Sequence, residues 1–226
     1  MRRVAVCLAL LFCIISLLTP VTAELRVFFL DVGQGDAIVL SCDGQTMLID
    51  AGLAEAGPVV NRFLKETLGI TELAAVIATH SDDDHIGGMP AALSGLQADT
   101  VLASPVVSMF YWFNNVQPVL RQSSLSVSVP EQGDQLTLGD AVLTFLNADD
   151  PALSVNNRSC VIRVDYGDTS FLLTGDAESD EELRLLADGA FLKADVIKIG
   201  HHGGLGSTGG NFLEAVSPTH AVISVG

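Results

Sequence analysis

Positive charge is scarce in this chain. Lysine and arginine together number 11, against 27 aspartate and glutamate residues, and the net charge is −16. Nine basic residues and all 27 acidic ones follow Ala23, so a chain cleaved there would carry −18. A field of that sign repels a polyanion at long range. The composition therefore argues against a broad DNA-binding groove, and it remains compatible with a small phosphate ester as substrate.

The N-terminal apolar run is shorter than a typical transmembrane helix. Residues 4–18 are almost entirely apolar, but about 15 residues fall short of the roughly 20 that a transmembrane helix needs. Arg2 and Arg3 precede the run, and residues 21–23 supply the small side chains that signal peptidase requires. We predict a signal peptide at 1–23, export to the periplasm or the cell exterior, and no stable membrane anchor after cleavage. A retained transmembrane anchor is the alternative.

Cysteine is also rare. Cys7 and Cys13 lie in the predicted signal peptide, so only Cys42 and Cys160 remain in the processed chain. An exported protein permits a disulfide between them, but each lies in an apolar, strand-like run where a buried thiol is common. The sequence leaves both alternatives open.

Residues 24–226 contain neither a low-complexity linker nor a heptad repeat, and apolar runs of strand and helix character alternate through both halves. The predicted strands are 25–30, 37–41, 45–49, 73–78, 100–103, 125–129, 135–138, 142–147, 160–165, 170–174, 195–199 and 221–225. The predicted helices are 58–68, 89–96, 109–120, 178–187 and 211–216. This alternation predicts one α/β domain in which two sheets pack face to face with helices outside.

Side chains that bind metals follow three of these apolar strands. They are His80, Asp82, Asp84 and His85 after the strand at 73–78, Asp176 after 170–174, and His201 and His202 after 195–199. Of the five histidines only His220 lies elsewhere. Because the ends of neighbouring strands meet at one edge of a sheet, we expect these side chains to converge there.

The spacing of the first group suggests two metal positions. Alternate residues of an extended segment face the same way, so His80, Asp82 and Asp84 would point to one of them. A turn eased by the following Gly-Gly pair would bring His85 to the other. Imidazoles with carboxylates suit zinc, or manganese where oxygen ligands dominate. Two such ions sharing Asp176 would hold a hydroxide at neutral pH.

Each group also has a simpler interpretation. Residues 81–84 could form a solvated acidic turn or an opportunistic calcium site. Asp176 could cap the helix that follows it, and His201 and His202 could lie in a flexible glycine-rich loop. The presence of all three groups together favours a metal site.

Six segments together resemble the metallo-β-lactamase superfamily, whose usual signature is His-x-His-x-Asp-His. They are residues 29–36, 48–52, 79–88, 156–159, 172–176 and 198–203. The Asp-Val-Gly-Gln-Gly-Asp and His-x-Asp-x-Asp-His elements resemble more closely the soluble domain of competence-related DNA-internalisation proteins of the ComEC type. The resemblance implies an αβ/βα four-layer sandwich with two zinc or manganese ions at one edge of the sheets.

The resemblance also implies roles for individual residues. His80, Asp82 and Asp176 would hold one ion, whereas Asp84, His85, Asp176 and either His201 or His202 would hold the other. The histidine that is not a ligand would contact a leaving-group or phosphate oxygen. The catalytic candidates are therefore His201 and His202, together with Asp84. Supporting roles outside the metal shell fall to Asp36, Asp50, Asn157 and Ser159.

The chain departs from the superfamily pattern in three places. Asp82 stands where the wider superfamily has histidine, as in the competence-type relatives. Residues 156–159, Asn-Asn-Arg-Ser, stand where the superfamily has another histidine ligand, so we expect the ion at His80 and Asp82 to be held less firmly. The relatives continue past the position of Gly226 with a histidine-bearing loop and a helix, so we expect these elements to be lacking or the chain to be incomplete.

The predicted function is an exported, metal-dependent hydrolase of phosphodiesters. DNA is the substrate that the relatives suggest, although the charge disfavours it. One alternative is hydrolysis of a C–O or C–N bond, as in a lactone or β-lactam. Another is a non-catalytic binding module that keeps the fold.

Overall fold

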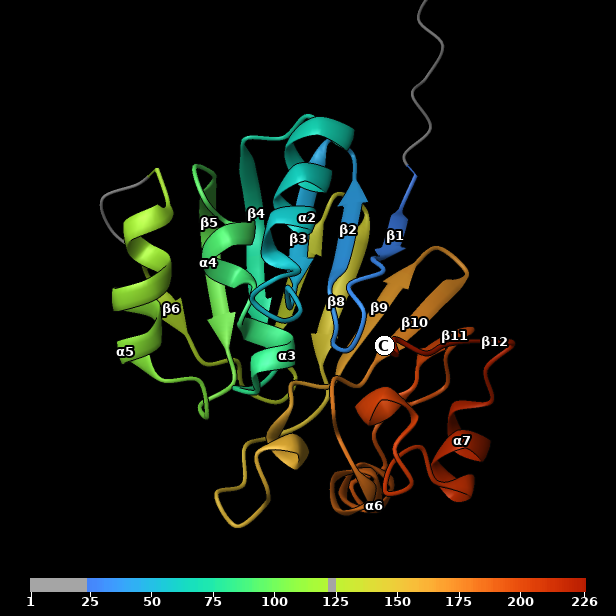
Figure 1. The fold of residues 1–226 in the computed structure, drawn as a ribbon. Coiled ribbons are helices and arrows are strands. Elements are labelled where there is room, and N and C mark those ends of the chain that lie inside the picture. The colour runs from blue at the N-terminus through green and yellow to red at the C-terminus, as the bar shows by residue number, and fades with distance from the viewer. Residues whose placement is uncertain (1–23, 122–124) are drawn as a thin grey trace, which may run out of the picture.

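The computed structural model describes residues 24–121 and 125–226, so the predicted signal peptide lies outside the described residues. Two six-stranded mixed sheets stand face to face, and helices cover their outer surfaces (Figure 1). In the described ranges, no helix combines the length and apolar character needed to cross a bilayer.

The N-terminal half forms the first sheet, in the order β1-β2-β3-β4-β5-β6. Its strands are β1 Arg26–Phe29, β2 Ile38–Cys42, β3 Gln45–Ile49, β4 Glu72–Ala78, β5 Gln97–Ala103 and β6 Val127–Ser128. The first three strands are antiparallel neighbours, and β3 to β6 run parallel. Asp43 and Gly44 both have positive φ in the turn that joins β2 and β3, as a tight two-residue hairpin turn requires.

The C-terminal half forms the second sheet, in the order β12-β11-β10-β9-β8-β7. Its strands are β7 Gln135–Leu138, β8 Ala141–Phe145, β9 Ile162–Tyr166, β10 Thr169–Leu173, β11 Val196–Lys198 and β12 His220–Val222. Strands β7 to β10 are antiparallel neighbours, whereas β10, β11 and β12 run parallel.

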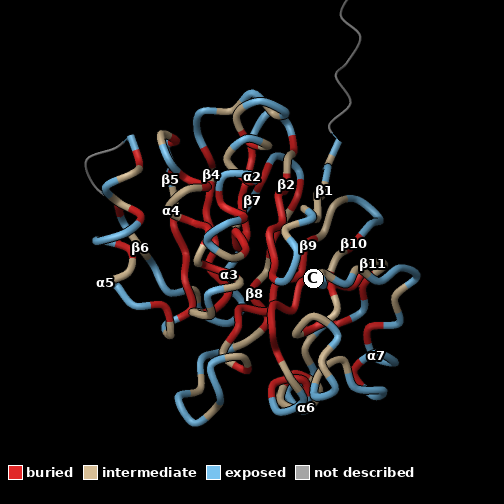
Figure 2. Tube along the Cα trace, viewed as in Figure 1, coloured by how far each residue is buried: buried red, intermediate tan, exposed pale blue. Residues whose placement is uncertain are grey.

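Alternating apolar side chains divide the interior into three cores. Ile38 and Leu40 point inward and pack with Phe145 of the facing sheet. Val39, between them, points outward into a core that includes Val60 of the covering helix α2 (Gly57–Arg62). A third core lies between the second sheet and helices α6 (Ser179–Ala187) and α7 (Gly210–Val216). Figure 2 shows the buried residues gathered in the central strands. The predicted helix–sheet–sheet–helix sandwich is confirmed.

The helices are shorter and less regular than predicted. The helix predicted at 58–68 is α2 followed by a π-helical turn, Phe63–Thr67. The helix predicted at 89–96 is α4 (Met89–Ala92) alone. The helix predicted at 109–120 consists of α5 (Met109–Tyr111), a π-helical turn at Trp112–Val116 and a 3₁₀ turn at Gln117–Val119, where Pro118 lacks an amide donor.

Some strands also differ from prediction. The strand expected at 100–103 begins earlier, at Gln97. Those expected at 125–129 and 221–225 shorten to β6 and β12. Pro130, which lacks an amide donor, follows β6 after one residue. Cys42 and Cys160 are both free and buried, so the structure has the buried thiols and no bridge between them.

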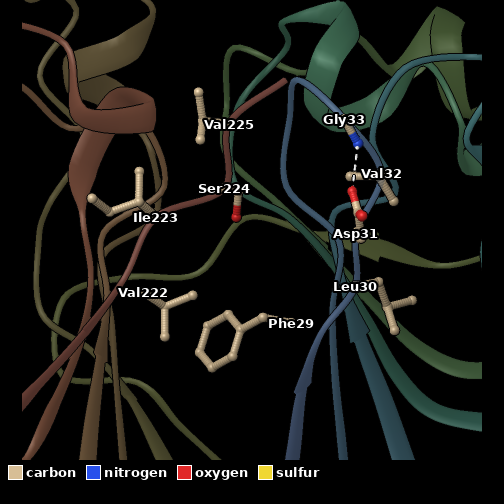
Figure 3. Close-up of a pocket in the computed structure, with 9 residues that line it drawn as sticks. All are labelled: Phe29, Leu30, Asp31, Val32, Gly33, Val222, Ile223, Ser224 and Val225. Atoms are coloured by element: carbon tan, nitrogen blue, oxygen red, sulfur yellow. Dashed lines mark hydrogen bonds between the residues drawn. The ribbon is translucent and has the colours of Figure 1, made fainter.

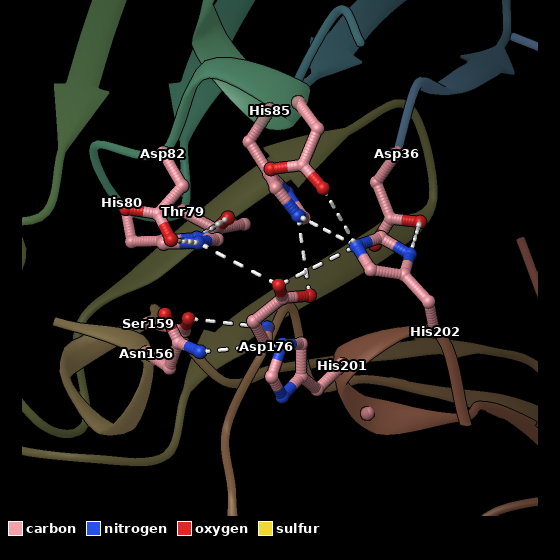
Figure 4. A network of polar contacts seen from close by, with 12 residues as sticks. Asp36, Thr79, His80, Asp82, His85, Asn156, Ser159, Asp176, His201 and His202 are labelled. Atoms are coloured by element: carbon pink, nitrogen blue, oxygen red, sulfur yellow. Dashed lines mark hydrogen bonds and ion pairs between the residues drawn. The ribbon is translucent and has the colours of Figure 1, made fainter. Parts of the chain in front are cut away.

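The three strands that precede the predicted ligands end at one edge of the sandwich. β4 ends at Ala78 in the first sheet, while β10 and β11 end at Leu173 and Lys198 in the second. The segments that follow them face one another where the two halves of the molecule meet (Figure 4). The fold thus brings together residues nearly 120 positions apart in sequence, such as His85 and His202.

Candidate metal centre

The segment after β4 carries the first group of predicted ligands. His80 is fully buried, whereas the Asp82 side chain is 46% exposed. Helix α3 (Asp83–Ile86) begins directly after Asp82. The backbone is therefore no longer extended at Asp84, and its side chain does not follow the alternation of His80 and Asp82. The prediction that alternation would point Asp84 to the same metal position as His80 and Asp82 is wrong. Its carboxylate lies instead beside His202, with Oδ2 3.3 Å from Nε2.

Asp176, which follows β10, lies in the centre of the polar network (Figure 4). It is 2% exposed. Its Oδ1 is 3.1 Å from His85 Nε2, and its Oδ2 is 3.4 Å from His202 Nε2 and 3.8 Å from His80 Nε2. One carboxylate thus reaches all three of these imidazoles, which is the geometry expected of a ligand shared by two ions.

The adjacent histidines after β11 point to different partners. Both adopt left-handed backbone conformations, with φ of 44° at His201 and 53° at His202. Such conformations are strained in non-glycine residues and concentrate at functional sites. His202 faces the network, whereas His201 turns toward Glu178, with Nδ1 2.9 Å from Oε1. Of the two histidines, the geometry therefore groups His202 with Asp84, His85 and Asp176.

The hydrogen-bond partners of three imidazoles fix which ring nitrogen carries the proton. The Ser224 carbonyl can only accept, so Nδ1 of His202 donates to it at 2.9 Å. His85 Nδ1 lies 2.8 Å from an Asp50 carboxylate oxygen. Thr79 Oγ1 gives its proton to Asp50, so it accepts from His80 Nδ1 at 3.1 Å.

With all three Nδ1 positions occupied in this way, the Nε2 lone pairs of the neutral rings converge on one region. His80 Nε2 is buried and has no hydrogen-bond partner among the described residues. Two Nε2 atoms, of His85 and His202, lie only 3.3 Å apart. Lone pairs that face one another need a cation or a proton between them. This arrangement fits a metal site.

The spacing of the donor atoms fits a small divalent ion. One donor atom each from Asp84, His85, Asp176 and His202 lies within 4.8 Å of the others. Tetrahedral ligands on bonds of about 2.0–2.2 Å stand about 3.3–3.6 Å apart. Four contacts among these residues, to which Asp176 contributes Oδ1 toward His85 and Oδ2 toward His202, measure 3.1 to 3.4 Å, close to that spacing.

The second predicted ligand set is wider. His80 Nε2 lies 3.7 Å from Asp82 Oδ2 and 3.8 Å from Asp176 Oδ2. The segment at 156–159, where the superfamily has a further histidine, has other contacts. Asn157 Oδ1 accepts from the Glu178 and Glu181 amides at the start of α6. Ser159 Oγ accepts from the Asp176 amide. These contacts fit the supporting roles predicted for Asn157 and Ser159.

The shifted pKa values of the cluster reflect strong interactions between its histidine and aspartate side chains. Burial alone would lower the pKa of His202, but contacts with the Asp176 and Asp84 carboxylates raise it to about 9. The hydrogen bond from His202 lowers the pKa of Asp84 to about 2. Burial likewise opposes the charged form of His85, yet Asp50 and Asp176 raise its pKa well above the usual range. A proton on Nε2 and a metal ion compete for the same lone pair, so metal binding would release protons.

Asp36, Asp50 and His85 form a second close group of potential ligands. Asp50 is already occupied, because it accepts from the Thr79 amide and hydroxyl and faces His85 Nδ1. Asp36 lies 2.9 Å from the Lys198 ammonium. We therefore interpret this group as the layer that supports the ligands, in line with the supporting roles predicted for Asp36 and Asp50.

Three contacts were not anticipated from sequence. Thr79 bridges His80 and Asp50, Glu178 faces His201, and the Ser224 carbonyl faces His202. Thr79 and Glu178 stand next to predicted ligands in the motif segments, which could have indicated them. The contact through Ser224 uses a backbone oxygen, which carries no sequence signal. Ser224 also lines a cleft of about 270 Å³ between segments 29–33 and 222–225 (Figure 3).

Comparison with known proteins identifies the family. The model of the metallo-beta-lactamase superfamily matches residues 30–226. The chain belongs to the metallo-β-lactamase superfamily. ComE operon protein 3 of Bacillus subtilis strain 168 is 32% identical over 225 residues, which cover 91% of this chain and 29% of that protein. Competence protein ComA of Neisseria gonorrhoeae is 29% identical, with 90% and 27% covered.

These relatives confirm the resemblance to the competence-type branch of the superfamily. The chain spans less than a third of the length of either protein. Among solved structures, CmlA, a diiron β-hydroxylase from Streptomyces venezuelae, superposes with a TM-score of 0.57 at 17% identity and covers 90% of this chain and 44% of that one. At this level of identity the likeness shows the fold.

Proposed function

We propose that the chain is an exported hydrolase that cleaves phosphodiester bonds with two divalent ions, zinc or manganese. The observation that carries the proposal is the convergence of three imidazole Nε2 atoms on the buried Asp176 carboxylate. Superfamily membership and the predicted signal peptide support it further.

Two sets of residues would hold the ions. Asp84, His85, Asp176 and His202 would hold one, and His80, Asp82 and Asp176 the other. Ions held there would supply an acidified water molecule and would polarise a phosphoryl oxygen of the substrate. The three carboxylates among these ligands make the site rich in hard oxygen donors, which favours phosphodiester chemistry over lactone or β-lactam hydrolysis.

The remaining side chains orient the ligands and the substrate. Asp50 and the Ser224 carbonyl fix the rings of His85 and His202 through Nδ1. His201 is held by Glu178, and its side chain is 38% exposed. Its Nε2 lies 3.4 Å from the Asn156 amide nitrogen. It can therefore reach a leaving-group or phosphate oxygen that enters from solvent.

The substrate class follows from two opposing indications. The chain is similar to competence proteins, and its motifs resemble those of DNA-internalisation proteins, which points to DNA. The strongly acidic composition opposes the approach of a long polyanion. We therefore propose a small diester, or a single strand that enters by its end.

The test offers the purified chain Mn²⁺ or Zn²⁺ with bis-p-nitrophenyl phosphate, a lactone or single-stranded DNA. We expect metal-dependent turnover of the phosphodiester, lost in Asp84→Ala and His85→Ala. His220→Ala is the matched control, because His220 is exposed and lies outside the centre. Metal content by mass spectrometry should give two equivalents. Two bound ions without turnover of any substrate would refute the enzymatic proposal, and turnover of the lactone alone would favour C–O bond hydrolysis.

A further inference from the structure

Lys198, the last residue of β11, is fully buried. Lysine is almost never fully buried unless it is paired. Its ammonium lies 2.9 Å from Asp36 Oδ2 and donates to the Ile199 carbonyl at 2.8 Å. Neither Asp36 oxygen has a partner in regular hydrogen-bond geometry among the described residues, so the contact with Lys198 is mainly ionic. The metal centre described above does not use this lysine.

Asp36 belongs to the opposite half of the molecule, where it lies near the end of the loop between β1 and β2. Its amide donates to the Asp84 carbonyl at 3.2 Å, and its carbonyl accepts from the Gly52 amide at 2.8 Å. Its Oδ1 lies 4.0 Å from His202 Nδ1 (Figure 4). Asp36 thus contacts one proposed ligand through its backbone and another through its side chain.

The loop packs directly against the Asp84 backbone, and only a glycine at position 35 allows this close approach. A Cβ atom at Gly35 would lie 2.1 Å from the Asp84 carbonyl oxygen, and φ is +119°, a conformation that other residues rarely adopt. The loop and the Asp84 backbone are therefore in direct contact, so a shift of the loop would displace Asp84.

Lys198 is close in sequence to His202, the second of these proposed ligands. Three residues lie between it and His202, and hydrogen bonds hold the backbone of this stretch in place. The Ile199 amide is bonded to the Val222 carbonyl, and the His201 amide to that of Gly175. The Asp36–Lys198 pair therefore ties the segment that carries Asp84 to the segment that carries His202.

We propose that Asp36 and Lys198 are positioning residues that set the separation of Asp84 and His202, and thereby the metal affinity of the Asp84–His85–Asp176–His202 set. This inference rests on the metal site of the proposed function, but it does not depend on turnover. The alternative is that the pair only fills the interior, in which case it would affect stability alone.

The test compares Lys198→Met, Asp36→Asn and the double variant with the wild-type chain. Each single change leaves a buried partner unpaired, so we expect lower unfolding temperatures in the metal-free protein. We expect Zn²⁺ affinity, measured by competition with a chelator, to fall by about 10–100-fold in both. The double variant removes both charges, so its unfolding temperature should recover while its metal affinity stays low. Lys193→Met, an exposed lysine in the same segment, is the matched control and should leave both quantities unchanged.

The positioning role is overturned if affinity recovers together with stability in the double variant, or if the single variants lose stability without losing affinity. Co²⁺ bound at the site gives a second readout, since its visible spectrum reports ligand geometry and should change in the variants that have lost the pair. If the wild type binds two ions but hydrolyses nothing, the proposed function fails and this inference stands. If the wild type is active and the variants keep full affinity, this inference alone fails.

Discussion

Replacing Asp50 by asparagine would show how far the carboxylate behind His85 controls the metal centre. Asp50 is 1% exposed, and its oxygens lie 2.9 Å from the Thr79 amide, 2.6 Å from the Thr79 hydroxyl and 2.8 Å from His85 Nδ1. Its φ is 56°, in the left-handed region where asparagine is well tolerated. The substitution therefore removes the charge and one acceptor without straining the backbone.

The expected magnitude follows from these contacts. An asparagine side chain has one acceptor oxygen, so its amide group must face a donor in place of the second oxygen. Hydrogen bonds to charged groups contribute about 1.5–3 kcal/mol each, so losing one or two of them should lower the free energy of unfolding by about 3 kcal/mol. His85 can relieve the conflict by moving its proton to Nε2, but this blocks the lone pair that faces Asp176. We therefore expect metal affinity to fall by about 10–100-fold.

Three measurements check this prediction: urea denaturation of the metal-free protein, chelator competition for Zn²⁺, and ¹⁵N NMR of the histidine rings in the Zn²⁺-loaded protein, which reports the protonated nitrogen. Asp168→Asn is the matched control, because Asp168 is exposed in the β9–β10 turn. If Asp50→Asn keeps wild-type affinity with the proton of His85 still on Nδ1, then Asp50 does not orient this ligand, and the reasoning is refuted.

Three further outcomes are expected. His202→Ala should cost one equivalent of bound metal, whereas His201→Ala should keep both and lose turnover; equal metal loss in the two variants would contradict their separation. Gly35→Ala should weaken metal binding through the clash with Asp84, and unchanged affinity would show that the loop yields freely. Glu181 has a pKa raised to about 7, chiefly by burial, against about 4.3 in an unfolded chain. The folded state therefore holds its proton more tightly, so stability should fall as pH rises from about 4 through 7. This decline in unfolding temperature should be smaller in Glu181→Gln, and identical profiles would show that another group causes it.

The sequence alone determined the architecture and the chemistry of the candidate centre. Alternating apolar residues such as Ile38, Val39 and Leu40 allow one face of a strand to pack on the opposite sheet and the other under helices, which dictates a layered sandwich. Polar residues directly after buried strands must gather where those strands end. Histidine and aspartate side chains gathered there carry the donor atoms that divalent metal ions prefer.

Only the tertiary structure decided which side chain faces which. His201 and His202 are adjacent and chemically identical, and two consecutive left-handed residues send their rings to different partners. Asp84 belongs with His202 because a helical turn begins at Asp83, a local change that no side-chain spacing reveals. The Asp36–Lys198 contact joins residues 162 positions apart, and a buried charge is matched only when the whole chain has closed around it. Spacing can identify the residues that belong to such a centre, whereas their grouping depends on long-range backbone contacts that form only in the folded molecule.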